Sequence, residues 1–236
     1  MPSLPPFTRF RRAAAGLVVA LLVVVAPSTA VADNPSPTND AVVVNTHDGS
    51  SVFKLAFSIR QITDGTVAPQ NAAVAYASCT DCQTVAIAIQ VVFVVGSPDT
   101  FTPQNVALAV NEQCTSCDTL ATAYQFIVQS SVPVRLTNDG RHQIDDIVKA
   151  LRDLDKSNLS IVEIQQRVDQ LMQQLAQVLA TEVEPIPGHA DDASSSSPPE
   201  ASDSAPSSTV VTTTSTTTTA TSTTTSTTTT TTTATS

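Results

Sequence analysis

The chain has 236 residues and a formal charge of −10, from 11 Lys or Arg residues against 21 Asp or Glu residues. Arg9, Arg11 and Arg12 lie in an N-terminal segment without acids, so removal of that segment lowers the charge to −13. Such a surface repels phosphate groups, which argues against nucleic acid and anionic lipid as partners. The chain has no Trp, seven Phe and two Tyr, so aliphatic side chains must fill the core.

Residues 1–32 have the pattern of a secretory signal peptide. The arginines precede an unbroken run of Ala, Gly, Leu and Val at residues 13–26, shorter than the ~20 residues of a membrane-spanning helix. Ala30-Val31-Ala32 offers a cleavage site before Asp33. We expect Sec export, cleavage between Ala32 and Asp33, and a secreted, extracellular or cell-wall-associated protein without a membrane segment. An uncleaved anchor is the alternative.

Residues 33–40 form a polar spacer, and strands are predicted after it. Residues 41–45 are apolar, and between residues 52 and 62 apolar side chains recur at every second position, at Phe53, Leu55, Phe57 and Ile59. This is the period of a half-buried strand. Asp48-Gly49 separates the two runs, which predicts a β-hairpin.

The centre of the chain contains an internal repeat, within a β-rich region assigned to residues 41–135. Pro69-Gln70-Asn71 and Pro103-Gln104-Asn105 each begin a segment that reaches a CxxC motif, with corresponding cysteines 35 residues apart. After each motif, small or polar residues alternate with bulkier ones. We predict two copies of a strand–CxxC–strand unit whose small side chains face a closely approaching layer. Two copies are too few for a solenoid.

The four cysteines are the candidate site: Cys79, Cys82, Cys114 and Cys117. In an exported protein an even number of cysteines favours structural disulfides, and the sequence leaves all three connectivities open. A zinc site with four cysteine ligands is one alternative. Redox-active thiols are the other, although Asp81 and Asp118 beside the motifs oppose the lowered thiol pKa that such chemistry needs.

Residues 136–184 are predicted to form a helical hairpin packed on the β-rich region. Ser160 and Glu163 have the spacing of a capping box. Six apolar residues then follow at heptad spacing: Ile161, Ile164, Val168, Leu171, Leu175 and Val178. Packing within the chain is the favoured interpretation of this seam, and a homodimer formed through the second helix is the alternative.

Residues 185–236 are predicted to be a disordered tail, first rich in Ser and Pro and then nearly pure Thr. Such tracts are typical of O-glycosylated stalks, and an unmodified tail is the alternative.

Motifs of known enzymes are missing from the sequence. His142 is followed by Gln143 rather than by the HExxH pattern, and His47 and His189 stand alone. The acidic pairs Asp145/Asp146 and Asp153/Asp155 are expected on a solvated helix face. The sequence therefore predicts a protein that is not an enzyme and has no cofactor, with zinc as the alternative.

Residues 45–53, 73–82 and 114–117 resemble a family of exported actinobacterial proteins of unknown function. The resemblance spans about residues 41–182 and extends to a domain found in putative peptide zinc metalloproteases. It implies no activity here, because the protease label belongs to a metal-binding membrane portion that this chain lacks.

Together these patterns predict an α+β fold: a duplicated β-rich domain, a C-terminal αα-hairpin and a disordered tail. The expected function is that of a secreted, disulfide-stabilised binding or structural protein, whose partner is a protein or a component of the cell envelope. An exported thiol–disulfide or zinc-binding protein is the alternative.

Overall fold

The structure is a computed structural model that describes residues 37–63, 65–187, 210–221 and 225–235. The signal peptide, the Ala32/Asp33 cleavage site and His189 lie outside these residues. The α+β class is confirmed at the level of a largely β-sheet protein with two helices.

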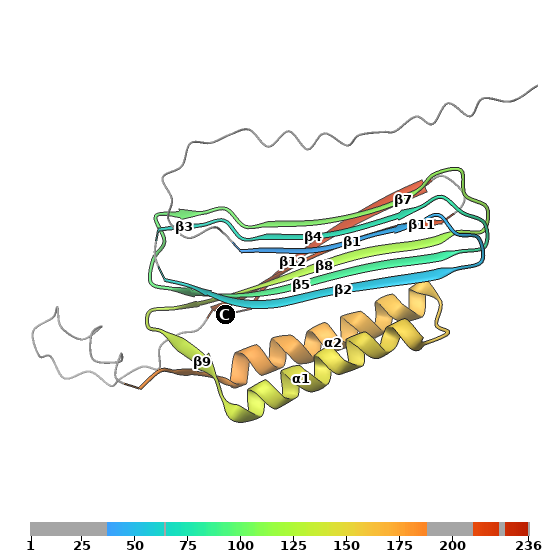
Figure 1. The fold of residues 1–236 in the computed structure, drawn as a ribbon. Coiled ribbons are helices and arrows are strands. Elements are labelled where there is room, and N and C mark those ends of the chain that lie inside the picture. Colours follow the sequence, from blue (N-terminus) through green and yellow to red (C-terminus); the bar gives the residue numbers. More distant parts are fainter. Residues whose placement is uncertain (1–36, 64, 188–209, 222–224, 236) are drawn as a thin grey trace, which may run out of the picture. The chain divides into compact units, whose positions relative to one another are not determined.

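The strands form three successive coils of a parallel β-solenoid (Figure 1). The outer sheet contains β1 (Thr38–Asn45), β4 (Gln70–Ala77) and β7 (Gln104–Asn111). The inner sheet contains β2 (Ser51–Ile62), β5 (Gln83–Val95) and β8 (Asp118–Ser130). Short strands β3 (Thr66–Val67) and β6 (Thr100–Phe101) pair where the chain returns to the outer sheet.

The predicted hairpin at Asp48-Gly49 is wrong. β1 pairs with β4 and β2 pairs with β5, so the turn carries the chain from one sheet to the other. The Gly49 N–H donates to the Thr80 carbonyl oxygen of the next coil, at 2.8 Å. The turn is therefore stabilised by stacking on its neighbour rather than by pairing of its own flanking strands.

The conclusion that two copies exclude a solenoid is also wrong, because the chain contains a third, divergent copy. Pro37-Thr38-Asn39 precedes the first coil as the two Pro-Gln-Asn tripeptides precede the others. The backbone register aligns Asn39 with Asn71 and Asn71 with Asn105. The recurring Pro-x-Asn was the available signal, but the first coil has no CxxC motif to reveal it.

Small side chains fill the space between the two sheets, as predicted. Alanines from both sheets form one buried cluster: Ala41, Ala73, Ala75, Ala86, Ala88, Ala107, Ala109, Ala121 and Ala123. The bulkier side chains of β5 and β8 point the other way, toward the helices. The alternation noted in the sequence thus sorts small residues between the sheets and large residues beneath the helices.

The helical hairpin covers the far face of the inner sheet (Figure 1). It contains α1 (Asn138–Asp153), a 3₁₀ turn at Leu154–Lys156 and α2 (Ile161–Thr181), which begins at the predicted Ser160/Glu163 capping box. All six residues of the heptad seam are buried in the core shared with the sheet. The seam that the sequence offered for homodimerisation is thus occupied by packing within the chain.

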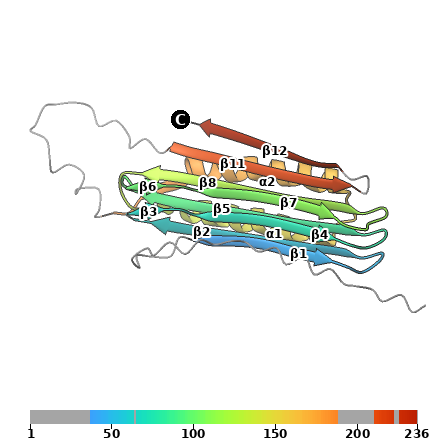
Figure 2. The same ribbon diagram turned by 90° about the horizontal axis from the view of Figure 1, so that it is seen from above.

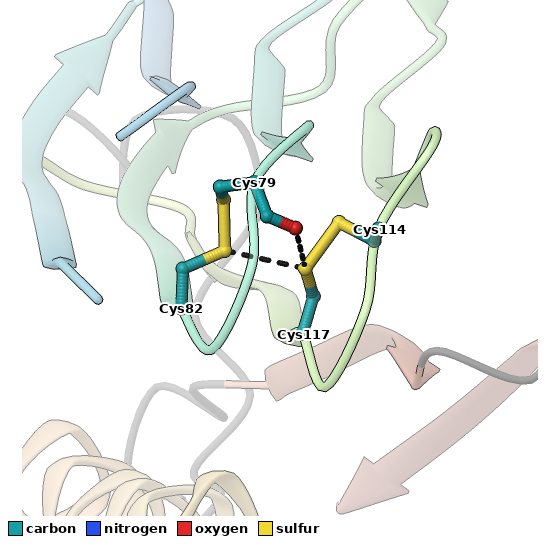
Figure 3. A group of neighbouring side chains, drawn as sticks. All are labelled: Cys79, Cys82, Cys114 and Cys117. Atoms are coloured by element: carbon teal, nitrogen blue, oxygen red, sulfur yellow. Dashed lines mark hydrogen bonds between the residues drawn. A yellow bond between two sulfur atoms is a disulfide. The ribbon is translucent and has the colours of Figure 1, made fainter. Parts of the chain in front are cut away.

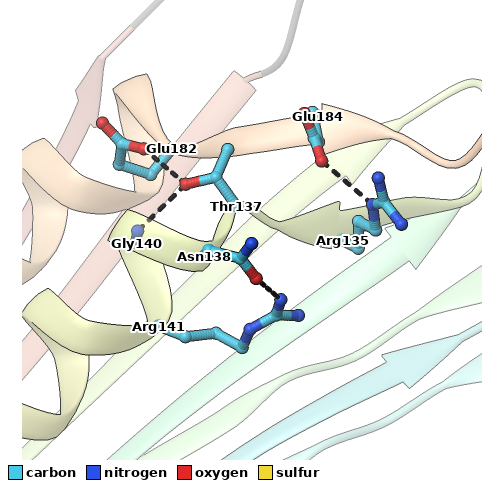
Figure 4. Close-up of polar contacts among 7 residues, drawn as sticks. All are labelled: Arg135, Thr137, Asn138, Gly140, Arg141, Glu182 and Glu184. Atoms are coloured by element: carbon cyan, nitrogen blue, oxygen red, sulfur yellow. Dashed lines mark hydrogen bonds and ion pairs between the residues drawn. The ribbon is translucent and has the colours of Figure 1, made fainter.

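Two short strands close the base of the hairpin (Figure 4). β9 (Val134–Leu136) pairs antiparallel with β10 (Val183–Pro185), and Arg135 forms an ion pair with Glu184 at 2.9 Å. Thr137 caps α1 by accepting the Gly140 N–H, and its hydroxyl donates to Glu182. A Cβ at Gly140 would lie 2.6 Å from the Cβ of Glu182, so this approach requires glycine.

The structure differs from the predicted disordered tail in part of residues 185–236. β11 (Val210–Thr221) pairs antiparallel with β8, and β12 (Thr225–Thr235) pairs with β11 (Figure 2). Thr is β-branched and favours strands, and β8 would otherwise leave an unpaired edge. Residues 188–209, 222–224 and 236 lie outside the described residues, so the tail prediction is untested there.

Candidate functional site

The two CxxC motifs stack on each other where the chain passes from the outer to the inner sheet (Figure 3). Cys79 and Cys82 follow β4, and Cys114 and Cys117 follow β7. A parallel bridge between Thr80 and Thr115 keeps the two loops in register. The predicted strand–CxxC–strand unit is therefore present in the second and third coils.

Each loop contains its own disulfide, Cys79–Cys82 in one and Cys114–Cys117 in the other. Among the connectivities that the sequence left open, the structure has the one within each motif. The two bridges touch, because the sulfur atoms of Cys82 and Cys117 are 3.3 Å apart. All four sulfur atoms lie within 4.8 Å of one another.

The loops share a backbone conformation that a plain strand lacks. Asp81 and Ser116, each at the third position of its motif, have positive φ angles of 52° and 56°, in the left-handed region that few non-glycine residues adopt. Hydrogen bonds between coils hold this shape: the Asp81 N–H donates to the Thr115 carbonyl oxygen at 2.8 Å, and the Thr80 N–H donates to the carboxylate of Asp48 at 2.8 Å. The geometry is thus supported by all three coils.

The sulfur atoms are largely shielded from solvent. Cys79 and Cys82 are each 4% exposed and Cys117 is fully buried, whereas Cys114 is only partly buried. Bonded sulfurs do not act as nucleophiles, and burial hinders attack by a large partner. As disulfides, the two pairs each close one of the loops that join the outer sheet to the inner sheet. As thiolates, they would offer four sulfur ligands of the kind that zinc accepts.

Other residues considered from the sequence form no comparable cluster in the described part of the chain. His47 is exposed in the first turn, and His142, Asp145, Asp146, Asp153 and Asp155 are exposed on or beside α1. The solvated-face interpretation of the acidic pairs is confirmed. Among the described residues, the four cysteines are the one group of metal-ligating side chains close enough to share an ion.

Sequence reasoning missed the outward face of the outer sheet. Register places Val74 between Val42 and Leu108, and Tyr76 between Val44 and Val110. Val44 is 60% exposed, Val106 51% and Val42 50%. Outward apolar residues recur at every second position, but without the pairing of strands these short runs cannot be assembled into one patch.

Sequence reasoning also missed a polar contact beneath the helices. The buried hydroxyl of Tyr124 on β8 donates to the carboxylate of Asp169 on α2, and Gln165 donates to both. Burial is the largest cause of the raised pKa of Tyr124, followed by the hydrogen bond to Asp169. The raised pKa keeps the side chain of Tyr124 neutral. Its hydrogen bond to Asp169 joins α2 to the sheet.

Comparison with known proteins gives no relative: no family model, curated protein or solved structure matches this chain. The resemblance to exported actinobacterial proteins therefore stays a prediction.

Proposed function

We propose that this chain is exported and acts as a non-catalytic binding or structural protein of the cell envelope or the extracellular space. The signal-peptide pattern supports export, and two disulfides are compatible with an oxidising compartment. No helix among the described residues is long and apolar enough to cross a membrane.

The exposed apolar face of the outer sheet carries the proposal. Its exposed residues are Val42, Val44, Val106 and Leu108, and its half-buried residues are Ala72, Val74, Tyr76 and Val110. A parallel sheet is normally covered on both faces, yet no described element covers this one. A contiguous exposed apolar patch commonly marks a binding surface.

The charge around this face favours some partners over others. Residues 61–134 contain no Lys, Arg or His, and Asp40 and Glu112 lie at the margins of the outer sheet. The patch therefore suits a neutral or basic protein surface or a wall component better than a phosphate-rich polymer. Such a partner agrees with the predicted protein or envelope component.

The alternative of a secreted thiol–disulfide exchanger is less well supported. An exchanger needs a thiolate that its substrate can reach, whereas three of the four cysteine residues are at most 4% exposed. The disulfides therefore serve stability better than turnover.

A triple Val→Thr variant at Val42, Val44 and Val106 tests the proposed face. Thr has nearly the shape of Val and keeps strand preference, so at these exposed positions the fold should persist while the face becomes more polar. We expect weaker fluorescence of an environment-sensitive apolar dye, with a melting temperature close to that of the parent. Val162→Thr is the matched control, because Val162 is 60% exposed on α2, away from the face. Unchanged dye binding in the triple variant would contradict the proposal.

A further inference from the structure

The two CxxC loops have the arrangement of a paired metal-binding knuckle. Each presents two sulfurs from a turn with a left-handed third residue, and the Thr80–Thr115 bridge aligns the turns. Four sulfurs around one zinc ion at ~2.3 Å stand about 3.8 Å apart in a tetrahedron. All four sulfurs already lie within 4.8 Å of one another, so the widest separation would have to contract only slightly, while the two sulfurs of each bridge would move apart to this distance once the bond is broken.

We propose that this cluster binds one zinc ion when both disulfides are reduced, so that disulfide closure and metal binding exclude each other. A dithiol reductant supplies two electrons and two protons to each disulfide and is itself oxidised to a disulfide. The four resulting thiols release their protons as they ligate the ion. The inference goes beyond the proposed function, because it does not involve the apolar face of the outer sheet.

The four cysteines differ in solvent exposure, and this difference decides which disulfide a reductant reaches first. Cys114 is partly exposed, whereas its bonded partner Cys117 is fully buried. A reductant therefore meets the Cys114–Cys117 bridge first. With both bridges closed, the sulfur of Cys117 lies 3.3 Å from that of Cys82, so reduction of the first bridge releases a thiol next to the second.

The surroundings favour a structural ion over a reactive thiolate. Asp81 lies within the first motif and Asp118 directly follows the second, so two carboxylates stand next to the cluster, and their negative charge favours a bound cation. A set of four sulfur ligands also leaves no open position for a substrate on a tetrahedral ion. The reduced cluster would thus hold zinc as a structural ion that joins the two loops, in place of the two disulfides that each close one loop.

Cobalt titration of the full mature chain tests this inference. The protein is reduced with a phosphine under anaerobic conditions, freed of reductant and titrated with Co²⁺, which reports tetrahedral thiolate ligation by its charge-transfer and d–d absorption. We expect one Co²⁺ per chain, displaced by an equal amount of Zn²⁺, and no binding before reduction. Native mass spectrometry gives the stoichiometry independently.

Two variants separate the site from general thiol binding. Cys114→Ala/Cys117→Ala leaves only Cys79 and Cys82 and should weaken cobalt binding by on the order of 100-fold or more. Thr115→Ala changes the same loop, keeps all four sulfurs and should bind like the parent. If reduction melts the sheet by circular dichroism, cobalt should restore it. Absence of thiolate ligation, or equal affinity in the double variant, would overturn the inference without affecting the dye test of the outer sheet.

Discussion

Asn71 occupies the centre of a polar ladder that crosses the three coils. Asn39 donates to the side-chain oxygen of Asn71 at 2.8 Å, and Asn71 donates to that of Asn105 at 2.8 Å. The same Asn71 amide also reaches the carbonyl oxygens of Ala88 and Tyr124 in the inner sheet. Gln125 and Gln90 form a second step of this kind, at 2.8 Å. The ladders join coil to coil and sheet to sheet at the start of each outer strand.

Replacing Asn71 by Ala should therefore be costly. Asn71 is 1% exposed, and its loss leaves buried partners without hydrogen bonds, so we expect a fall of about 2–3 kcal/mol in the free energy of unfolding. Chemical denaturation measures the change. Gln70→Ala is the control, because Gln70 directly precedes Asn71 in β4 and is exposed. A loss no larger than that of the control would show that the ladder does not contribute to stability.

At the scale of the element, α2 begins with a capping box that the sequence predicted correctly. The Ser160 N–H donates to the Glu163 carboxylate at 2.9 Å, and the Glu163 N–H donates to the Ser160 hydroxyl at 3.4 Å. Hydrogen bonds from Ser160 are the largest cause of the lowered pKa of Glu163. A carboxylate whose pKa is lowered by folding stabilises the folded state at pH values above its ordinary pKa of 4.5. That stabilisation is lost as the pH falls through the lowered pKa of the folded state.

Substitutions at this cap have a predicted pH signature. Ser160→Ala should lower the free energy of unfolding by about 1 kcal/mol at neutral pH, and Glu163→Gln should reduce the loss of stability below pH 4.5. Denaturation at neutral and acidic pH checks both, with Gln166→Ala, exposed on the same helix, as the control. Parallel pH profiles for the parent and Glu163→Gln would contradict the role of the carboxylate.

Local patterns predicted elements well where the signal lay within one element. The heptad seam and Ser160/Glu163 defined α2, and alternation after each CxxC defined β5 and β8. The hairpin predicted at Asp48-Gly49 is wrong because the residues of a turn do not show whether the two flanking strands pair in one sheet or lie in two facing sheets. Spacing identified the four cysteines as the candidate site, but spacing alone did not decide between bridges within each motif, which the structure has, and bridges between the two stacked motifs.

At the scale of the molecule, the two ends of the solenoid differ. At one end β1 and β2 leave edges without a partner strand among the described residues. Lys54 of β2 occupies the row of Ala86 and Ala121 and remains exposed, and a charge at such a position discourages further strand pairing. At the other end β11 covers β8, and Thr218 donates to the carbonyl oxygen of Ala107 on β7. The Thr-rich segment thus acts as a cap, which composition alone did not indicate.

The two stacked loops are each closed by their own disulfide, and we propose that the solenoid to which they belong is exported. Intact mass and peptide mapping of the secreted protein, alkylated without prior reduction, test both points most directly. We predict a chain starting at Asp33, no alkyl adducts, and Cys79–Cys82 and Cys114–Cys117 linkages. Adducts on the native protein, or bridges between the two motifs, would contradict the account.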